Sequence, residues 1–328
     1  MAVFTPIDLS DISEWISQDF NIGQATEIRG IHGGIENSNF FLDTRLDGKK
    51  QEYVLTIFER LSAEQLPYYL ELMRHLAIQG IPVPKPIENK HGQILFSLKG
   101  KPTAIVSKLP GISRLQPEAS HCALVGQMLA KMHLAGKDFS KAQENLRSLS
   151  WWQKTVPLVL PHLDPAQKEL LSNELSTQEQ FFSSDQYALL PSGASHCDLF
   201  RDNVLFDAKG SLNTGDTAAD HLGGFFDFYF AGNDKWLFDL AVTANDWCLA
   251  ENKQDLDPER LKSLINAYQS IRPLTQEEQA SWPLMLRAAA LRFWISRLWD
   301  FYLPRDAQML TPHDPIHFEH ILLSRRTL

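Results

Sequence analysis

The chain is poor in cysteine, with only three among its 328 residues, at Cys122, Cys197 and Cys248. They are far apart, odd in number and contain no Cys-x-x-Cys pair. Disulfide-rich domains and structural zinc sites need closely spaced cysteines, so the sequence supports neither. We expect the three thiols to be reduced.

Positive charge is also scarce. The chain has 31 Lys and Arg against 40 Asp and Glu, a net charge of 31 − 40 = −9, and no basic cluster interrupts this balance. A surface that binds nucleic acid needs concentrated positive charge, so nucleic acid is not expected as a partner.

Long apolar runs are missing as well. No uncharged stretch approaches the roughly 18 residues needed to span a bilayer, and the N-terminus lacks a basic start followed by an apolar run. The sequence therefore predicts a cytoplasmic protein that does not contact a membrane. It leaves the oligomeric state open.

What the chain does have is the composition of a globular enzyme, with 44% apolar and 22% charged residues. Its length suggests roughly two structural units, which makes a site between them the first one to consider. Residues 25–58 predict antiparallel strands with a turn at Asp47-Gly48, and Leu66 to Ala77 follow helical spacing. A further hairpin is expected within 94–109. The first unit is thus predicted as an antiparallel sheet with one helix.

From Glu118 onward helical periodicity dominates, with later helices expected near 165–182, 236–250, 257–270 and 283–302. One non-helical island, at about 194–230, contains two predicted short strands, 203–207 and 224–230. We predict an α+β protein with a β-rich lobe at residues 1–108 and an α-rich lobe at 109–328, joined by a hinge at Leu109-Pro110-Gly111.

The island contains a chemically suggestive motif. It begins with a polar loop that carries His196, Asp198 and Asn203, and its second strand carries Asp227 among phenylalanines. Carboxylate and amide oxygens suit Mg²⁺, and phosphoryl transfer needs both such ligands and an acceptor for the substrate's hydroxyl proton. We therefore predict Asp198 as the catalytic base, Asn203 and Asp227 as metal ligands, and His196 as a brace for the loop. The alternative is a loop of Asx turns beside a core Asp.

A glycine-bearing segment between the first two strands could cover phosphate groups. It reads Gly30-Ile-His-Gly33-Gly34-Ile-Glu-Asn37-Ser38-Asn39. Glycines allow a close approach to phosphates, and backbone N–H groups with short Ser and Asn side chains can donate to them. The alternative is an ordinary hairpin turn.

These two segments resemble those of the kinase-like small-molecule phosphotransferases, the group of aminoglycoside phosphotransferases and choline kinases. The likeness extends to Leu109-Pro-Gly, Gly126-x-x-Leu-Ala-x-Met-His133 and Asp239-Leu-Ala, and so covers most of the chain. Within that group the sequence most resembles the bacterial homoserine kinases of this fold, through segments such as Phe226-Asp-Phe-Tyr-Phe-Ala-Gly-Asn-Asp234.

The resemblance implies a bilobal protein-kinase-like fold that binds ATP, with adenine against backbone near Ser107 to Leu109, and Mg²⁺. It implies that Asp239 is a buried brace for the catalytic loop. It also implies phosphorylation of the hydroxyl of L-homoserine, a step of threonine biosynthesis. The alternatives are another alcohol kinase, acting on choline or an aminoglycoside, and a nucleotide-binding scaffold without catalysis.

The sequence departs from the wider group at one important position. Thr56 stands where a phosphate-binding Lys is usual, so the helix residue Glu71 lacks its expected partner; Arg60 or Lys108 could substitute for that Lys. The stretch from Asp207 to Gly224 is also longer than the group's usual turn, and it offers Asp216 and Asp220 as competing metal ligands.

Homoserine itself requires a cation for its carboxylate and acceptors for its ammonium. Arg292 and Arg297 on the last long helix are the candidates for the carboxylate, although an Arg on the back of an amphipathic helix is more often solvated. Asp234 or Asp246 are the candidates for the ammonium.

Overall fold

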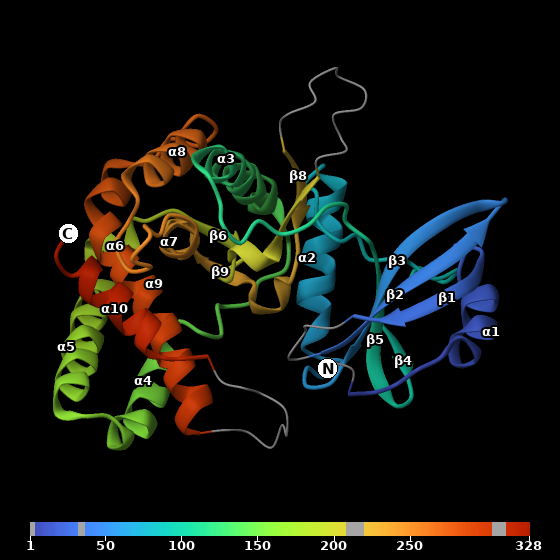
Figure 1. The fold of residues 1–328 in the computed structure, drawn as a ribbon, viewed down its shortest axis with the longest axis horizontal. Coiled ribbons are helices and arrows are strands. Elements are labelled where there is room, and N and C mark those ends of the chain that lie inside the picture. The colour runs from blue at the N-terminus through green and yellow to red at the C-terminus, as the bar shows by residue number, and fades with distance from the viewer. Residues whose placement is uncertain (1–3, 32–36, 208–219, 304–312) are drawn as a thin grey trace. The chain divides into compact units, whose positions relative to one another are not determined.

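A computed structural model describes residues 4–31, 37–207, 220–303 and 313–328 of the chain (Figure 1). It contains two compact units, Met1–Pro110 and Gly111–Leu328. The first contains an antiparallel sheet and the second is mostly helical, so the α+β class expected from the sequence is confirmed. Among the described residues, no helix combines the length and the apolarity that crossing a membrane would need.

The first unit is built on one five-stranded antiparallel sheet. The strand order is β1 (Gln24–Gly30), β2 (Asn37–Leu46), β3 (Lys49–Phe58), β5 (Lys101–Ser107) and β4 (Phe96–Leu98). Asp47 and Gly48 both have positive φ, at 49° and 76°, which gives the two-residue turn expected between β2 and β3.

Two helices accompany this sheet, and not the one helix predicted. The predicted helix is α2 (Leu66–Ile78), and the additional helix is α1 (Leu9–Asp19), which contacts β1 (Figure 1). Only Ile12 and Ile16 of α1 are buried, so its apolar pattern is too short to be distinguished by periodicity. Its start is instead fixed by a capping box between Asp8 and Asp11.

The second unit consists of packed helices with two small two-stranded sheets. Its elements are α3 (Ala119–Ala135), α4 (Leu149–Val159), α5 (Pro165–Phe182), α6 (Asp185–Ala188), β6 (Ser192–Ser195), β7 (Val204–Asp207), β8 (His221–Phe225), β9 (Gly232–Lys235), α7 (Trp236–Trp247), α8 (Pro258–Gln269), α9 (Gln276–Tyr302) and α10 (Ile316–Arg325). β6 pairs with β9 and β7 pairs with β8, both antiparallel. The helix expected from residue 283 begins seven residues earlier, at Gln276, because Thr275 and Glu278 form a capping box.

Helix α7 is the centre of the second unit. All twelve of its residues are buried, and it contacts α3, α8 and α9 (Figure 1). A helix whose residues are all buried is enclosed by its neighbours on every side. The polar side chains of α7, including Asp239 and Asp246, are therefore held in fixed positions inside this unit.

Close packing of α3 against α8 depends on Gly126. A Cβ atom added at Gly126 would lie 2.3 Å from the carbonyl oxygen of Leu264, a backbone atom that cannot rotate away. We therefore expect Gly126→Ala to lower the free energy of unfolding by about 1 to 3 kcal/mol, the usual cost of overpacking. Urea denaturation measures this, with Lys131→Ala at an exposed position of α3 as the control. A Gly126→Ala protein as stable as the wild type would contradict the expected contact.

Candidate active site

One buried carboxylate, that of Asp239, holds the loop that follows β6 in place through hydrogen bonds. Asp239 Oδ2 accepts a hydrogen bond from the backbone N–H of His196, and Oδ1 accepts one from that of Cys197, each at 2.8 Å. Cys197 has a φ of 63°, a left-handed conformation that costs energy in a non-glycine residue. The two hydrogen bonds to Asp239 compensate for this cost and set the direction in which the next residue, Asp198, leaves the loop.

Asp239 has a further partner in His133 of α3. Nε2 of His133 lies 3.0 Å from Asp239 Oδ2, and its Nδ1 lies 2.7 Å from the hydroxyl of Tyr268. Burial alone would raise the pKa of Asp239, but the hydrogen bond from His133 and the charge interactions hold it below its usual value. Asp239 is therefore an anion that orients the loop from inside the protein.

His196 links the loop to the segment that carries Asp227. Its Nε2 lies 2.9 Å from the carbonyl oxygen of Phe226, so Nε2 must carry the hydrogen. Burial lowers the pKa of the imidazole, which favours its neutral form. The backbone N–H of Phe226 in turn donates to the carbonyl oxygen of Asn203 at 3.0 Å.

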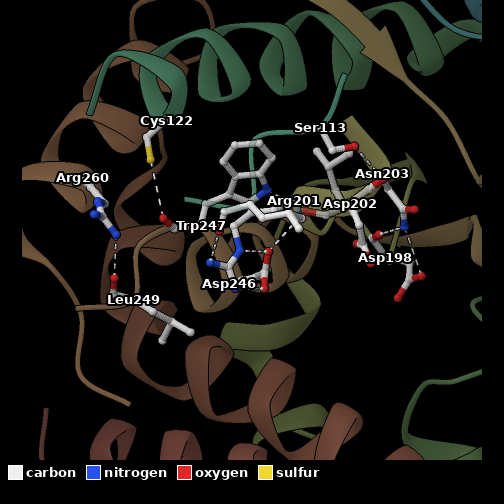
Figure 2. A network of polar contacts seen from close by, with 12 residues as sticks. Ser113, Cys122, Asp198, Arg201, Asp202, Asn203, Asp246, Trp247, Leu249 and Arg260 are labelled. Atoms are coloured by element: carbon white, nitrogen blue, oxygen red, sulfur yellow. Dashed lines mark hydrogen bonds and ion pairs between the residues drawn. The ribbon is translucent and has the colours of Figure 1, made fainter. Parts of the chain in front are cut away.

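Asp198 and Asn203 face each other across the loop (Figure 2). Asn203 Nδ2 donates to the carbonyl oxygen of Asp198 at 2.9 Å and lies 3.5 Å from its carboxylate Oδ2. Burial raises the pKa of Asp198 to about 8; Arg292 opposes this rise and Asp227 adds to it. The amide nitrogen of Asn203 is used in this way, which leaves its oxygen as the atom available to a cation.

The position of Asp227 differs from the prediction. The second strand of the island ends at Phe225, and Asp227 lies at a left-handed corner with φ 64° and ψ 58°. The run of phenylalanines suggested a longer strand, but Gly224 and Asp227 both take positive φ and turn the chain. The side chain is exposed, and not enclosed by aromatic rings as expected.

A second anchor for the loop was not anticipated from the sequence. Arg201 donates to Asp246 of α7 through its backbone N–H, Nε and Nη2, at 2.8 to 3.1 Å, and through Nη1 to the carbonyl of Leu115 (Figure 2). Trp247 Nε1 also donates to the carbonyl oxygen of Leu199 at 3.0 Å. Asp246 is thus committed to Arg201, which removes it as a candidate for a substrate ammonium group.

The donor set suits a hard divalent cation. Asn203 Oδ1 and the Asp227 carboxylate are oxygen ligands of the kind that Mg²⁺ takes together with water and phosphate oxygens. Among residues 4–31, 37–207, 220–303 and 313–328, no group of three or more His, Cys, Asp or Glu side chains could hold a metal ion. Mg²⁺ usually takes only one or two protein carboxylates and fills its other positions with water and substrate phosphate oxygens, so two protein oxygens are a sufficient donor set.

Asp220, one of the two competing metal ligands, is already engaged in contacts with other side chains. Asp220 is paired with Arg114 at 2.7 Å and with His121 at 2.9 Å, and the hydrogen bonds from these two groups lower its pKa to about 2. Asp216 lies outside the described residues.

Arg292 is buried rather than solvated, at 3% exposure. Burial lowers the pKa of its guanidinium to about 10, although the carboxylate of Asp198 opposes this shift. Arg297, also on α9, is partly buried; burial lowers its pKa, and Asp198 and Asp300 oppose the change. The helix has no solvated back face here, because α9 contacts α4, α5, α7 and α10.

Asp234 of β9 is oriented by two hydrogen bonds. Asn145 Nδ2 donates to its Oδ2 at 2.6 Å, and the backbone N–H of Lys235 donates to its Oδ1 at 2.7 Å. Burial raises the pKa of Asp234 to about 6, and these hydrogen bonds limit the rise. Burial raises the pKa of the neighbouring Cys197 thiol well above its ordinary value; Asp239, Asp234 and Asp198 add to this rise and Arg292 opposes it.

In the first unit, the predicted phosphate cover is described only in part. Gly33 and Gly34 lie outside the described residues, whereas Asn37, Ser38 and Asn39 begin β2. The hydroxyl of Ser38 is fully buried: it accepts from the N–H groups of Phe4 and Thr5 and donates to Glu59 at 2.5 Å. Ser38 is therefore engaged inside the unit and does not offer its hydroxyl to a ligand.

Thr56, at the usual lysine position, donates to Asn39 Oδ1 at 2.8 Å. Lys108, which was considered as a substitute for that lysine, pairs with Glu52 at 2.9 Å. Glu71, the residue expected to pair with the lysine, pairs with Arg74 at 3.0 Å. The predicted adenine-binding segment has Ser107 hydrogen-bonded to Lys85 through both its N–H and its hydroxyl, and Leu109 partly buried two residues beyond.

Comparison with known proteins gives a consistent result. The family described as the phosphotransferase enzyme family matches residues 27–301. The homoserine kinase of Cupriavidus necator is 60% identical over 99% of this chain and 96% of its own, and that of Burkholderia vietnamiensis is 57% identical over the same shares.

Solved structures share the fold. An amicoumacin kinase in complex with AMP-PNP and Ca²⁺ matches with a TM-score of 0.68 at 15% identity, over 98% of this chain and 92% of its own. The choline kinase of Cryptosporidium parvum matches with a TM-score of 0.62 at 14% identity, over 92% and 89%. The chain therefore belongs to the phosphotransferase enzyme family and, within it, to the homoserine kinases.

Proposed function

We propose that this enzyme transfers the γ-phosphoryl group of ATP to the hydroxyl of L-homoserine and forms O-phospho-L-homoserine, which serves threonine biosynthesis. The relatives at 55 to 60% identity that share nearly the whole chain bear the name homoserine kinase. The structural observation that carries the proposal is the placement of Asp198. Its carboxylate lies 3.5 Å from the Asn203 amide nitrogen in a buried loop; burial raises its pKa to about 8, a rise that Arg292 opposes and Asp227 increases.

Asp198 would accept the proton of the substrate hydroxyl and align its oxygen with the γ-phosphorus. Most of the rate in phosphoryl transfer comes from positioning and charge stabilisation, so a fixed carboxylate direction matters more than a strong base. The hydrogen bonds from the His196 and Cys197 N–H groups to Asp239, and those from Arg201 to Asp246, supply that direction. His196 is a positioning residue, since its imidazole donates to a backbone carbonyl.

Asn203 and Asp227 would hold Mg²⁺ through their oxygen atoms. When bound, the cation neutralises charge on the nucleotide phosphates. For the first unit, we keep the prediction that the side chains of Asn37 and Asn39 contact nucleotide phosphates and that backbone groups between Ser107 and Leu109 contact an adenine.

Arg292 would attract the carboxylate of homoserine, with Arg297 as a second, partly buried cation on the same helix. Asp234 would accept from the ammonium group. The ligand groups of a zwitterion are thus matched by opposite charges within one unit. The three cysteines are buried free thiols, which agrees with the reducing cytoplasm in which we place the enzyme.

The test is a panel of alcohols with ATP and Mg²⁺, monitored by ADP release. We expect turnover with L-homoserine, a phosphate ester on its side-chain oxygen by ³¹P NMR, and little turnover with choline or kanamycin. Chelation of the divalent cation should abolish the reaction. Preferred turnover of choline or kanamycin would replace the substrate assignment, and nucleotide binding without ADP release on any alcohol would indicate a scaffold. Growth of a threonine auxotroph lacking its own homoserine kinase is the corresponding test in cells.

A further inference from the structure

Two nitrogen atoms of the buried Arg292 guanidinium lack hydrogen-bond partners. Its Nη1 donates to Ser296 Oγ at 3.1 Å, but Nε and Nη2 are buried and make no hydrogen bond. Unpaired donors on a buried charged group are costly, and their usual explanation is a ligand or a functional role. Its guanidinium lies over two aromatic rings, 3.9 Å from the centroid of Phe293 and 5.3 Å from that of Phe230.

The guanidinium of Arg147 also lies near the Phe230 ring. The Cζ of Arg147 lies 6.0 Å from the centroid of Phe230 and 4.4 Å from that of Trp151. The two like charges are close enough for Arg147 to lower the pKa of Arg292. The buried Nε and Nη2 of Arg292, which make no hydrogen bond, therefore lie near a ring that a second cation also contacts, and this geometry points to an anion site.

The segment that carries Arg147 is held firmly against β9. The N–H of Arg147 donates to Asn145 Oδ1 at 2.8 Å, and Trp152 Nε1 donates to the carbonyl of Arg147 at 2.6 Å. A Cβ atom on Gly232 would lie 2.8 Å from the backbone of Asn145, which shows how closely the two segments pack. Asn145 also donates to Asp234, so one short segment orients both an anionic and a cationic side chain.

We propose that Arg147 and Arg292, held on Phe230, form a paired receptor for the substrate carboxylate and thereby select an α-amino acid over a simple amino alcohol. This inference rests on the proposed function, because it assigns substrate selection at the same site. A guanidinium pair can offer parallel N–H donors to both oxygens of a carboxylate, whereas a choline-like cation would be repelled. Asp234, whose carboxylate is oriented by the hydrogen bond from Asn145, would bind the ammonium group.

The experiment compares Arg147→Gln and Arg147→Lys with the wild type on two alcohols, L-homoserine and 3-aminopropan-1-ol, which lacks only the carboxylate. We expect Arg147→Gln to raise KM for L-homoserine about tenfold to a hundredfold, from the loss of a charged hydrogen bond, with KM for ATP unchanged. The efficiency with 3-aminopropan-1-ol should remain as in the wild type, and Arg147→Lys should recover part of the loss. An unchanged KM for L-homoserine, or equal losses on both alcohols, would overturn the proposal.

Two further measurements separate this inference from folding and from the proposed function. Lys141→Gln, which removes a positive charge from an exposed position six residues away, is the matched control, and thermal unfolding reports any loss of packing on Trp151. Calorimetric binding of L-2-aminobutyrate, which keeps the carboxylate but has no hydroxyl, needs no turnover. If the wild type binds L-2-aminobutyrate more tightly than Arg147→Gln does but does not phosphorylate homoserine, the proposed function is wrong and the carboxylate receptor still stands. Equal binding would defeat the receptor.

Discussion

Asp198→Asn is expected to lower kcat for homoserine phosphorylation by about a hundredfold to ten-thousandfold, the range for loss of a positioned general base. The amide keeps the size of the side chain but cannot accept the hydroxyl proton as a carboxylate does. The backbone bonds that fix the loop, from His196 and Cys197 to Asp239, do not involve the Asp198 side chain. The fold and the affinity for ADP should therefore remain close to those of the wild type.

Asp202→Asn provides a matched control for this prediction. Asp202 carries the same charge in the same loop, but its side chain is exposed and is not among the side chains assigned to the site. Steady-state kinetics of both variants, with calorimetric titration of ADP, separate chemistry from nucleotide binding. Near-normal turnover by Asp198→Asn would refute its role, and an equal loss in Asp202→Asn would show that loop charge in general, rather than Asp198, controls the rate.

The features predictable from the sequence are those encoded over short distances. The loop from His196 to Asn203 could be identified because its functional groups lie within eight consecutive residues. The turn at Asp47-Gly48 and helix α2 follow from local turn chemistry and periodicity. Helices α4 and α10 were not anticipated, since each is short and α4 contains Pro157.

The features not predictable from the sequence are long-range pairings. Arg201 meets Asp246 across 45 positions, and Asn145 meets Asp234 across 89. The local sequence does not predict these partners, because a charged residue in a helix or loop is usually solvated. Arg292 shows the same limit: its neighbours on α9 suggest an exposed face, but the helices packed around α9 bury it.

The loop anchor at Asp239 predicts the largest effect on stability. Asp239→Ala leaves the N–H groups of His196 and Cys197 and the His133 imidazole without their common acceptor, all in buried positions. Removing one partner of a buried charged network costs about 3 to 5 kcal/mol, and we expect a loss of that size in the free energy of unfolding. Equilibrium denaturation in urea measures it.

Stability should also respond to pH in a defined direction. The folded pKa of Asp239 lies below 3.8 and that of His133 lies below 6.5. In both cases the unfolded chain binds protons more readily, so the wild type should lose stability as pH falls through 6.5 and again as it approaches the unfolded pKa of the carboxyl. The second of these losses should be smaller in Asp239→Asn, which has no carboxyl to protonate.

Because Asp239→Ala could fail to fold, Asp239→Asn is the decisive variant for catalysis. Its amide can accept at one atom only, so one of the two loop N–H groups loses its acceptor and Asp198 loses its fixed direction. We expect kcat to fall while KM for ATP changes little, as for a group that acts through the position of Asp198. Thr243→Val, four residues along α7, removes only a hydrogen bond to the carbonyl of Asp239 and is the control, with a cost of about 1 kcal/mol and kcat retained. A folded Asp239→Asn enzyme with wild-type kcat would show that the loop keeps its direction without this anchor.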